Sequence, residues 1–374
     1  MSKLYEVANY SELRIKSNNI SLENYVTTDS LLQNKQGRIP AKNLPPQSCT
    51  LIAYYKNDIL IGNIRPYLQK IWFADSDGGN SADVLTLTVN KNHNPKFVYY
   101  ALLSDSFFEH MMKGSKGSKM PRGDKNQILT YDIPEFSIEQ ENKIASVLST
   151  LDAKIALNRQ LNDNLEAMAK TLYDYWFVQN ADKSWEQKSL YDIATYINGL
   201  ACQNYRPTDN NHYRVIKIRE MRDGFTSDSE LITTNIPQNI IVNDGDILFS
   251  WSASLEVMIW TGGVGGLNQH IFKVTLGKYP KSFVYFQLLN YLDHFRMIAN
   301  NRRTTMGHIT IDHLKQSRIF IPPVEIIHRF DEMINPILNK QVTLKQQSLK
   351  LAQLRDWLLP MLMNGQVSVN YHLA

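Results

Sequence analysis

The sequence repeats itself at an offset of 188 residues, and this duplication limits the possible folds more than any other feature. The matches are Ile133-Pro134 with Ile321-Pro322, Asp58-Ile59-Leu60 with Asp246-Ile247-Leu248, and Tyr25 with Tyr213. Each Ile-Pro pair precedes a long run with helical spacing. The period is far longer than the roughly 20–50 residues of a solenoid repeat. We therefore expect two similar globular domains, each followed by a long helix, and DNA is the bipartite partner that suits such a pair best.

Composition sets the outer limits. A chain of 374 residues with 43% hydrophobic and 20% charged side chains is typical of two or three globular domains. Cys49 and Cys202 stand in unrelated contexts, so we expect neither a disulfide framework nor a cysteine metal site, and we expect a cytoplasmic protein. No signal peptide or membrane span is recognisable, which predicts no membrane association. The net charge of +4 is only mildly basic, so nucleic-acid binding has to depend on local clusters.

A first long helix is predicted to begin after Pro134. Ser137 and Gln140 have the spacing of a capping box, in which each side chain binds a free backbone amide at the helix start. Apolar residues then follow at alternating spacings of four and three, which is the seam of a coiled coil running to about Phe177. The seam consists of Ile144, Leu148, Leu151, Ile155, Asn158, Asn162, Leu165, Ala169, Leu172 and Trp176.

The second long helix follows the same rule, and an offset of 189 brings the two seams into register. Its seam consists of Phe330, Met333, Ile337, Lys340, Leu344, Gln347, Leu351, Leu354, Leu358 and Met361. Pro336 removes a backbone donor and is expected to kink this helix or to start it afresh. The polar seam residues Asn158, Asn162, Lys340 and Gln347 either fix the alignment of the helices or face solvent or another subunit.

Connectivity predicts how the helices pair. The second domain begins near Gln179, at the end of the first helix, and finishes near Pro323, at the start of the second. The two ends of a compact domain lie close together, so the helices pack antiparallel. The expected fold is α/β (α+β), with two pseudo-twofold-related globular domains separated by two long antiparallel helices that form a coiled coil. Such an arrangement suits two DNA half-sites about one turn, roughly 34 Å, apart.

Both globular domains are predicted to mix short strands with one amphipathic helix. The helices are expected at Pro95–Met112 and Pro280–Asn300, and Asp77–Asn80 is expected to form a turn. The predicted strands of the first domain are Leu51–Tyr55, Asp58–Ile64, Lys70–Phe73 and Val84–Val89. Those of the second are Tyr213–Ile218, Ile240–Val242, Asp246–Trp251, Val257–Trp260 and His270–Val274.

A polar, basic loop follows the amphipathic helix in each copy. In the first copy the cations Lys113, Lys116, Lys119, Arg122 and Lys125 recur every third residue among glycines and serines. The second copy has Arg302, Arg303 and Thr304 at the same point. A flexible segment of this kind can bring cations close to phosphates, although a charge run can also be a solvated face. Its recurrence in both copies favours DNA contact.

Further candidates for DNA contact lie elsewhere in the two domains, because Arg, Asn and Gln match the hydrogen-bonding edges of guanine and adenine. For each of these residues, plain surface or hydrogen-bonded core remains the alternative. They are Arg65 and Tyr67 in the first domain, and Lys217, Arg219, Arg222, Trp251, Ser252, Asn268, Gln269 and His270 in the second, where the three cations fall on a predicted strand and turn.

The sequence contains few motifs that are typical of an enzyme. It has no GxxxxGK[ST] loop and no HExxH motif. Asp132, Glu141 and Lys143 have a spacing similar to that of metal-dependent nucleases, but Glu141 and Lys143 fall in the first turns of the predicted helix, where an acidic residue is explained by the helix dipole. A binding module is therefore favoured over a self-sufficient nuclease. A structural coiled-coil scaffold without DNA contact is the third possibility.

Three features together resemble the specificity subunit of type I restriction-modification systems. They are the segments Asp58–Tyr67 and Gly245–Ser250, the paired Ile-Pro helix starts, and the tail Leu354–Gly365. The resemblance spans essentially the whole chain. Two departures stand out: the Trp185–Ile197 segment has no obvious counterpart before the first domain, and Glu139-Gln140 is replaced by Ile327-His328 in the second copy.

The resemblance implies target-recognition domains at 1–132 and 179–320, and helical regions at 133–178 and 321–374. Each domain would read one half of a bipartite double-stranded DNA target, while the helices set the spacing and bind two modification (methyltransferase) subunits. The chain itself would be non-catalytic and bind no cofactor. S-adenosylmethionine would be used by the modification subunits, and ATP and Mg²⁺ by restriction subunits where these exist.

Overall fold

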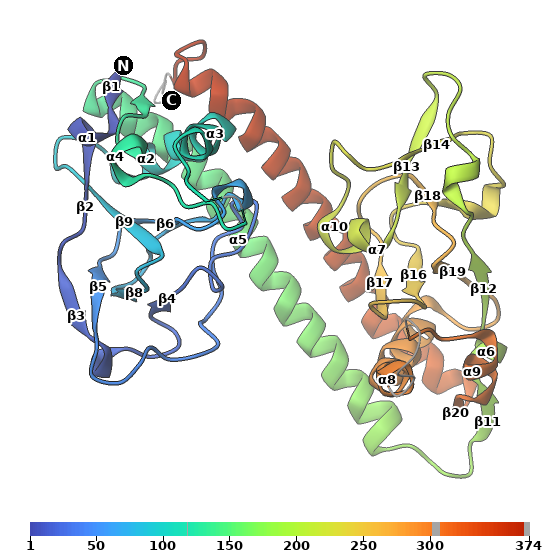
Figure 1. Cartoon of the computed structure of the whole chain (residues 1–374). Helices are drawn as coiled ribbons and strands as arrows, with labels where there is room; N and C mark the ends of the chain where they lie inside the picture. Colours follow the sequence, from blue (N-terminus) through green and yellow to red (C-terminus); the bar gives the residue numbers. More distant parts are fainter. Residues whose placement is uncertain (118, 301–306, 370–374) are drawn as a thin grey trace, which may run out of the picture. The chain divides into compact units, whose positions relative to one another are not determined.

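The computed structural model describes residues 1–117, 119–300 and 307–369. The chain divides into two compact units. Unit 1 comprises Met1–Lys154 and Leu351–Ala374, and unit 2 comprises Ile155–Lys350. The two long helices, α5 (Ile138–Tyr173) and α10 (Val324–Met363), contribute to both units and are drawn in green and red in Figure 1. Among the described residues, no helix is long and apolar enough to span a membrane.

Unit 1 contains two four-stranded sheets and a two-stranded ladder. The first sheet is antiparallel and has the order β2 (Ala8–Tyr10), β9 (Val84–Val89), β6 (Ile59–Gly62), β7 (Ile71–Phe73). The second has the order β3 (Arg14–Lys16), β5 (Thr50–Tyr54), β8 (Gly78–Asn80), β4 (Tyr25–Val26), with β4 parallel to β8. The ladder joins β1 (Ser2–Lys3) to β10 (Asp132–Ile133).

Unit 2 has the same three components. Its first sheet is antiparallel and has the order β12 (Ala194–Asn198), β19 (Ile271–Leu276), β16 (Ile247–Ser250), β17 (Glu256–Ile259). Its second has the order β14 (Leu231–Thr233), β13 (His212–Ile216), β18 (Gly265–Leu267), β15 (Ile241–Val242), with β13 parallel to β18. The ladder joins β11 (Glu186–Ser189) to β20 (Arg318–Ile321). All nine strands predicted from the sequence are present in the two units, with small shifts of their ends.

Further helices, shorter than α5 and α10, complete each unit. Unit 1 has α1 (Leu4–Val7), α2 (Pro95–Leu102), α3 (Asp105–Lys113) and α4 (Lys125–Ile128), and unit 2 has α6 (Leu190–Ile193), α7 (Ile218–Asp223), α8 (Lys281–Asn300) and α9 (Ile311–Gln316). The prediction of one helix at Pro95–Met112 was wrong, because the hydroxyl of Ser104 accepts the backbone N–H of Phe107 and starts a second helix there. The expected turn at Asp77–Asn80 contains the short strand β8.

The sequence repeat has a structural counterpart at the start of the central strands β6 and β16. The carboxylate of Asp58 accepts the backbone N–H of Tyr55 at 2.8 Å, and the carboxylate of Asp246 accepts that of Asn243 at 2.8 Å. The match of Tyr25 with Tyr213 is different. In the second sheet of unit 1, Tyr25 of β4 pairs with Gly79 of β8. In the second sheet of unit 2, Gly266 of β18 takes the place of Gly79, and its partner on β13 is Val215. Tyr25 and Tyr213 therefore lie two positions apart in the two sheets.

The first domain does have a counterpart of the segment before the second, so that expectation was wrong. The Leu4–Val7 helix follows β1 and precedes β2, as Leu190–Ile193 follows β11 and precedes β12. Both helices start with the same capping contact: Glu6 accepts the backbone N–H of Lys3 at 2.7 Å, and Asp192 accepts that of Ser189 at 2.8 Å. A four-residue helix is too short for its periodicity to appear in the sequence.

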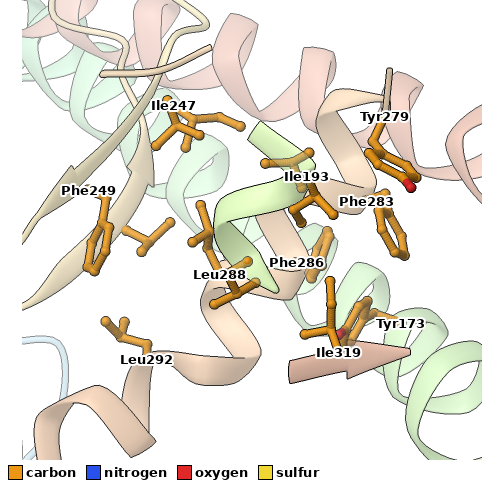
Figure 2. Packing of buried hydrophobic residues seen from close by; sticks show 14 of the residues in the cluster. Tyr173, Ile193, Ile247, Phe249, Tyr279, Phe283, Phe286, Leu288, Leu292 and Ile319 are labelled. Atoms are coloured by element: carbon orange, nitrogen blue, oxygen red, sulfur yellow. The ribbon is translucent and has the colours of Figure 1, made fainter. Parts of the chain in front are cut away.

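The main core of unit 2 packs α8 against one face of the first sheet and against the long helices. Figure 2 shows Phe283 and Phe286 of α8 near Tyr173 of α5, and the rings of Tyr173 and Phe286 stack with centroids 5.5 Å apart. From α10, Phe330 is fully buried in the same cluster. Unit 1 buries Leu148 of α5 and Leu362 of α10 in its own core. The long helices are thus part of both hydrophobic cores.

The ends of the long helices agree with the sequence prediction. Ser137 and Gln140 form the predicted capping box, with bonds of 3.2 and 3.3 Å, and α5 begins at Ile138. It continues as a π-helical stretch at Asp174–Gln179. Of the two effects expected of Pro336, a kink or a restart of the helix, the restart does not occur, because α10 runs through this residue as one helix.

Within each unit the two helices run antiparallel. In unit 2 the side-chain amide of Asn158 donates to Gln347 at 2.9 Å, and Gln341 donates to the backbone carbonyl of Asn162 at 3.3 Å. In unit 1 the guanidinium of Arg355 lies 2.8 Å from the carboxylate of Asp152.

The predicted seam is only partly buried along both helices. Its buried residues are Ile144, Leu148, Asn158, Asn162, Ala169, Phe330 and Leu344. Its half-buried residues are Leu151, Ile155, Leu165, Leu172, Trp176, Ile337, Leu351, Leu358 and Met361. Met333, Lys340, Gln347 and Leu354 are exposed, so placing Met333, Lys340 and Leu354 in the seam was wrong. The reason is that a straight helix with 3.6 residues per turn drifts from a strict heptad pattern, and the buried residues of α10 in unit 2 follow the order Phe330, Ile334, Leu338.

Candidate nucleic-acid interface

The connection after β6 brings two sets of predicted DNA-contact residues together in unit 1. The backbone N–H of Asn63 donates to Asp83 at 2.9 Å, and Ile64 forms an isolated β-bridge with Arg122. Arg65 follows with a left-handed φ of 54°, and its N–H donates to the carbonyl of Pro121 at 2.7 Å. Arg65 is therefore attached to the basic loop by backbone hydrogen bonds.

The basic loop itself has regular structure. The backbones of Lys116 and Arg122 exchange two hydrogen bonds of 3.0 Å each and form an isolated β-bridge. The guanidinium of Arg122 lies 3.0 Å from the carboxylate of Asp83. Lys116 lies 3.5 Å from Asp124, whose pKa is lowered first by backbone hydrogen bonds at the start of α4. These contacts fix the path of the loop.

Several cations of this region remain available to a ligand. Arg65, Lys113 and Lys119 are exposed, and within the described residues none of them forms an ion pair. Lys125 lies over the ring of Tyr10, with its ammonium 5.8 Å from the ring centroid. Tyr67, on the 3-10 turn Pro66–Leu68, is 53% exposed. An exposed aromatic ring beside unpaired cations is chemically suited to sugar and phosphate contacts.

The equivalent connection in unit 2 follows the same backbone course. The N–H of Trp251 donates to His270 at 3.2 Å, and Ser252 forms an isolated bridge with His308. Ile309 donates to the carbonyl of Trp251 at 2.8 Å, as Gly123 donates to that of Asn63 at 3.2 Å in unit 1. Ala253 then takes a left-handed φ of 57°. The two connections are alike in backbone and different in side chains.

A shallow cavity of about 490 Å³ lies on this connection in unit 2. Its lining residues are Trp251, Ser252, His270, Phe272, His308, Ile309 and Thr310. The Trp251 ring contacts two imidazoles, with its centroid 5.5 Å from that of His270 and 6.4 Å from that of His308. Its indole N–H donates to Asn198 at 3.0 Å, which fixes the ring orientation. Where unit 1 has the ion pair of Arg122 and Asp83, unit 2 has an aromatic surface.

Three predicted cations of unit 2 are neutralised by carboxylates of the same unit. Lys217 lies 2.5 Å from Glu230, Arg219 lies 2.8 Å from Asp228, and Arg222 pairs with Glu256. They occupy the start and body of α7, so the prediction of a strand and turn was wrong here. The Thr226 hydroxyl, followed by the Arg219 guanidinium, lowers the pKa of Asp228 to about 2. These cations have structural partners and are weaker candidates for DNA contact than Arg65.

Asn268 and Gln269 are also less accessible than expected of residues that contact DNA. Asn268 is buried, and its side-chain oxygen accepts the backbone N–H of His270 at 3.3 Å. Gln269 is half-buried, with its side-chain nitrogen 3.4 Å from the His270 ring. The predicted residues Arg302, Arg303 and Thr304 lie outside the described residues.

The nuclease-like trio is dispersed over separate contacts. Asp132 pairs with Lys3 at 2.7 Å, and Lys143 pairs with Glu139 at 2.7 Å. Glu141 is buried, where it accepts the backbone N–H of Asn94 at 2.7 Å and lies 2.8 Å from a His93 ring nitrogen. In the described part of the chain, no group of three or more His, Cys, Asp or Glu side chains could hold a metal ion. These three residues therefore have structural roles.

The fold defines a duplicated protein, because the first sheet of each unit has the same strand order and is followed by the same backbone course. The chain matches the family described as type I restriction modification DNA specificity domain over residues 2–167 and 182–352, and it belongs to that family.

Named relatives carry the same description. The chain is 24% identical to the MjaIX type I restriction enzyme specificity subunit of Methanocaldococcus jannaschii, over 73% of this chain and 69% of the relative. It is 22% identical to the HindI specificity subunit of Haemophilus influenzae, over 92% and 94%. The crystal structure of a type I restriction-modification S subunit from M. genitalium has the same fold, with a TM-score of 0.60, 15% identity and coverage of 97% and 95%.

Proposed function

We propose that each of the two units reads one half of a bipartite DNA target. The observation that carries this proposal is the repeated backbone course at Asn63–Arg65 and Trp251–Ala253, which presents different side chains from the same scaffold. Two copies of one scaffold with different surfaces suit two half-sites of different sequence. The target-recognition domains are assigned to 1–132 and 179–320.

Lysines of the basic loop provide the affinity for the phosphate backbone. Lys113 and Lys119 are exposed and form no ion pair within the described residues, and they lie in the same segment as the bridged residues Lys116 and Arg122. Phosphate neutralisation releases counterions, so binding weakens steeply as salt rises. With a net charge of only +4, the chain binds DNA weakly alone and more tightly in complex with its partners.

The long helices set the spacing of the half-sites and bind two methyltransferase subunits. Exposed apolar side chains on both helices support the second role, because large apolar groups in water favour burial against a partner. On α5 in unit 2 these are Leu157, Leu161 and Met168, with exposed fractions of 47%, 38% and 46%. On α10 in unit 1 they are Leu354 and Trp357, with 42% and 57%. Leu157, Leu161, Met168 and Trp357 could have been recognised in the sequence as apolar residues beside the predicted seam, and Leu354 had been placed in the seam itself.

The chain acts without a catalytic centre or cofactor of its own. S-adenosylmethionine is used by the methyltransferase subunits to methylate adenine, and ATP and Mg²⁺ are used by restriction subunits where these are present. The separate structural contacts of Asp132, Glu141 and Lys143 support this assignment over a self-sufficient nuclease.

The test is a genome-wide map of methylated adenine in the host with and without this gene. Loss of methylation at one bipartite motif with a fixed unspecified spacer is the expected result, and it would give both half-sites at once. A map that is unchanged when the partner subunits are produced from the same host would contradict the proposal. Restoring the gene on a plasmid is the control, and it should restore the same motif.

A further inference from the structure

The two units share an unusual backbone conformation at one exposed position. Arg65 and Ala253 both have left-handed φ angles, 54° and 57°, and stand at the same place in the repeat, 188 residues apart. A left-handed conformation costs a residue with a Cβ atom roughly 1–2 kcal/mol, and it is normally given to glycine. Both copies nevertheless have a side chain there.

The surrounding hydrogen bonds explain why the conformation is kept. Up to this position the two units have matching backbone contacts. Asn63 and Trp251 each donate to the residue that precedes a strand of the first sheet, Asp83 before β9 and His270 before β19. Ile64 and Ser252 each form a bridge with a residue that precedes α4 or α9. Beyond it they diverge. Unit 1 continues into the 3-10 turn Pro66–Leu68, while unit 2 enters β17 at Glu256.

The left-handed φ is therefore a property of the fold and does not depend on which side chain is present. Arg and Ala differ in length, charge and hydrogen bonding, yet both have a left-handed φ at this position, 54° and 57°. A position at which the backbone is alike and the side chain differs between the units is suited to reading a different base in each half-site. We infer that this position determines specificity, with Arg65 reading a guanine in the half-site of unit 1 and Ala253 presenting only a methyl group in unit 2.

The chemistry of Arg65 fits a base edge. Its guanidinium is exposed and has no hydrogen bond or ion pair within the described residues, whereas that of neighbouring Arg122 is held by Asp83. A free guanidinium can donate two parallel hydrogen bonds to the O6 and N7 atoms of guanine in the major groove. A methyl group in its place can contact a thymine methyl but cannot select guanine. The inference rests on the proposed function, because it requires that the units bind DNA.

The test uses glycine, which removes the side chain and also relieves the left-handed backbone. Arg65→Gly and the matched control Ala253→Gly are expressed with the partner subunits in the host that lacks the native gene, and methylated adenine is mapped. Arg65→Gly should relax one guanine position, in one half-site only, by roughly ten- to hundred-fold, while the spacer and the other half-site stay unchanged. Ala253→Gly should leave the motif as it is. Ala253→Arg should add a guanine preference in the other half-site.

Other outcomes would overturn the inference. An unchanged motif in Arg65→Gly would show that Arg65 reads no base. A uniform loss of methylation at all sites would show that it contacts phosphate, because phosphate contacts weaken binding without regard to sequence. Thermal unfolding of the purified full-length variants checks that both glycine variants are at least as stable as the wild type. Failure of the proposed function is distinguishable, since in that case the wild-type chain would direct no motif.

Discussion

Unit 1 and unit 2 agree strand for strand in their first sheets and differ in their second. The edge strand β3 lies beside β5 in unit 1, whereas the edge strand β14 lies beside β13 in unit 2. The residues of the central strands explain the difference. Ile59 and Ile61 face the core that includes α5 and α10, while Leu60 between them faces a small cluster with Tyr54 and Trp72. The face against the long helices is constrained by their packing, and the opposite face is free to diverge.

The two units also hold the long helices together in different ways. In unit 1 the carboxylate of Asp152 binds both Arg355 and the hydroxyl of Tyr100, at 2.8 and 2.6 Å. The offset of 189 between the helices puts Gln341 at the place of Asp152 in unit 2, where it makes a bond of 3.3 Å to a backbone carbonyl. Charged contacts in one unit are thus replaced by neutral amides in the other. The following changes test this comparison, in order of decreasing effect.

Removing Phe330 is expected to have the largest effect. Its side chain is fully buried in the unit 2 core among Tyr173, Phe177 and Phe286. Phe330→Ala should lower the stability of unit 2 by about 3–5 kcal/mol, because it removes buried apolar surface and leaves a cavity. Hydrogen exchange should show faster exchange in β16 and β19. Unit 1 strands β6 and β9 should keep their protection, and an equal loss in both units would show that they open as one body.

Replacing Asp152 should have an intermediate effect. Asp152→Ala leaves the half-buried Arg355 without its inter-helix partner and the Tyr100 hydroxyl without its acceptor, which should cost about 1–3 kcal/mol. The matched variant Gln341→Ala removes only one long neutral bond and should cost about 0.5–1 kcal/mol. Urea unfolding of both variants gives the comparison. Equal losses would mean that the charge of the unit 1 contact adds nothing.

Much of this fold could be predicted from the sequence because its signals are local. The Ser137 and Gln140 side chains that start α5 are three residues apart, and the strands have runs of β-branched and aromatic residues. The pairing of Gly79 and Gly266 into sheets could not be predicted, because glycine has little strand propensity. Each of these strands is instead fixed by its neighbours in the sheet.

The candidate interface was harder to predict than the fold, because charge in the sequence does not show which cations have partners. Nothing in the sequence distinguishes Arg65 from Arg219 as a candidate for DNA contact. In the structure Arg219 is held by Asp228, nine positions further along the chain. The backbone of Arg65 is joined to the basic loop, while its guanidinium forms no ion pair within the described residues. The left-handed conformation of Ala253 gave no signal in the sequence, since alanine rarely adopts it.

Asn158 offers a test in which stability should rise. Its side-chain nitrogen bonds Gln347, but its oxygen is buried without a partner within the described residues. Asn158→Leu combined with Gln347→Leu removes this polar pair and should stabilise unit 2 by about 1 kcal/mol, since an unsatisfied buried polar group costs free energy. The gain should come with a less specific helix alignment. Lys340→Leu, at an exposed position on α10, is the control and should change stability by less than about 0.5 kcal/mol. A lower melting temperature in the double variant would show that the amides stabilise the pair.

The two cysteines give the smallest effect, a difference in reactivity without a difference in stability. Cys202 of unit 2 is fully buried, and burial raises the pKa of its thiol to about 11, whereas Cys49 of unit 1 is only half-buried. The thiolate is the reactive form, so at pH 8 only about one Cys202 side chain in a thousand is ionised. Iodoacetamide should modify Cys49 first, because the Cys202 thiol is fully buried and reacts only when it becomes exposed. Peptide mass spectrometry separates the two sites, and urea, which exposes both thiols, should bring their rates together. Equal rates in the native chain would mean that the second sheet of unit 2 opens as readily as that of unit 1.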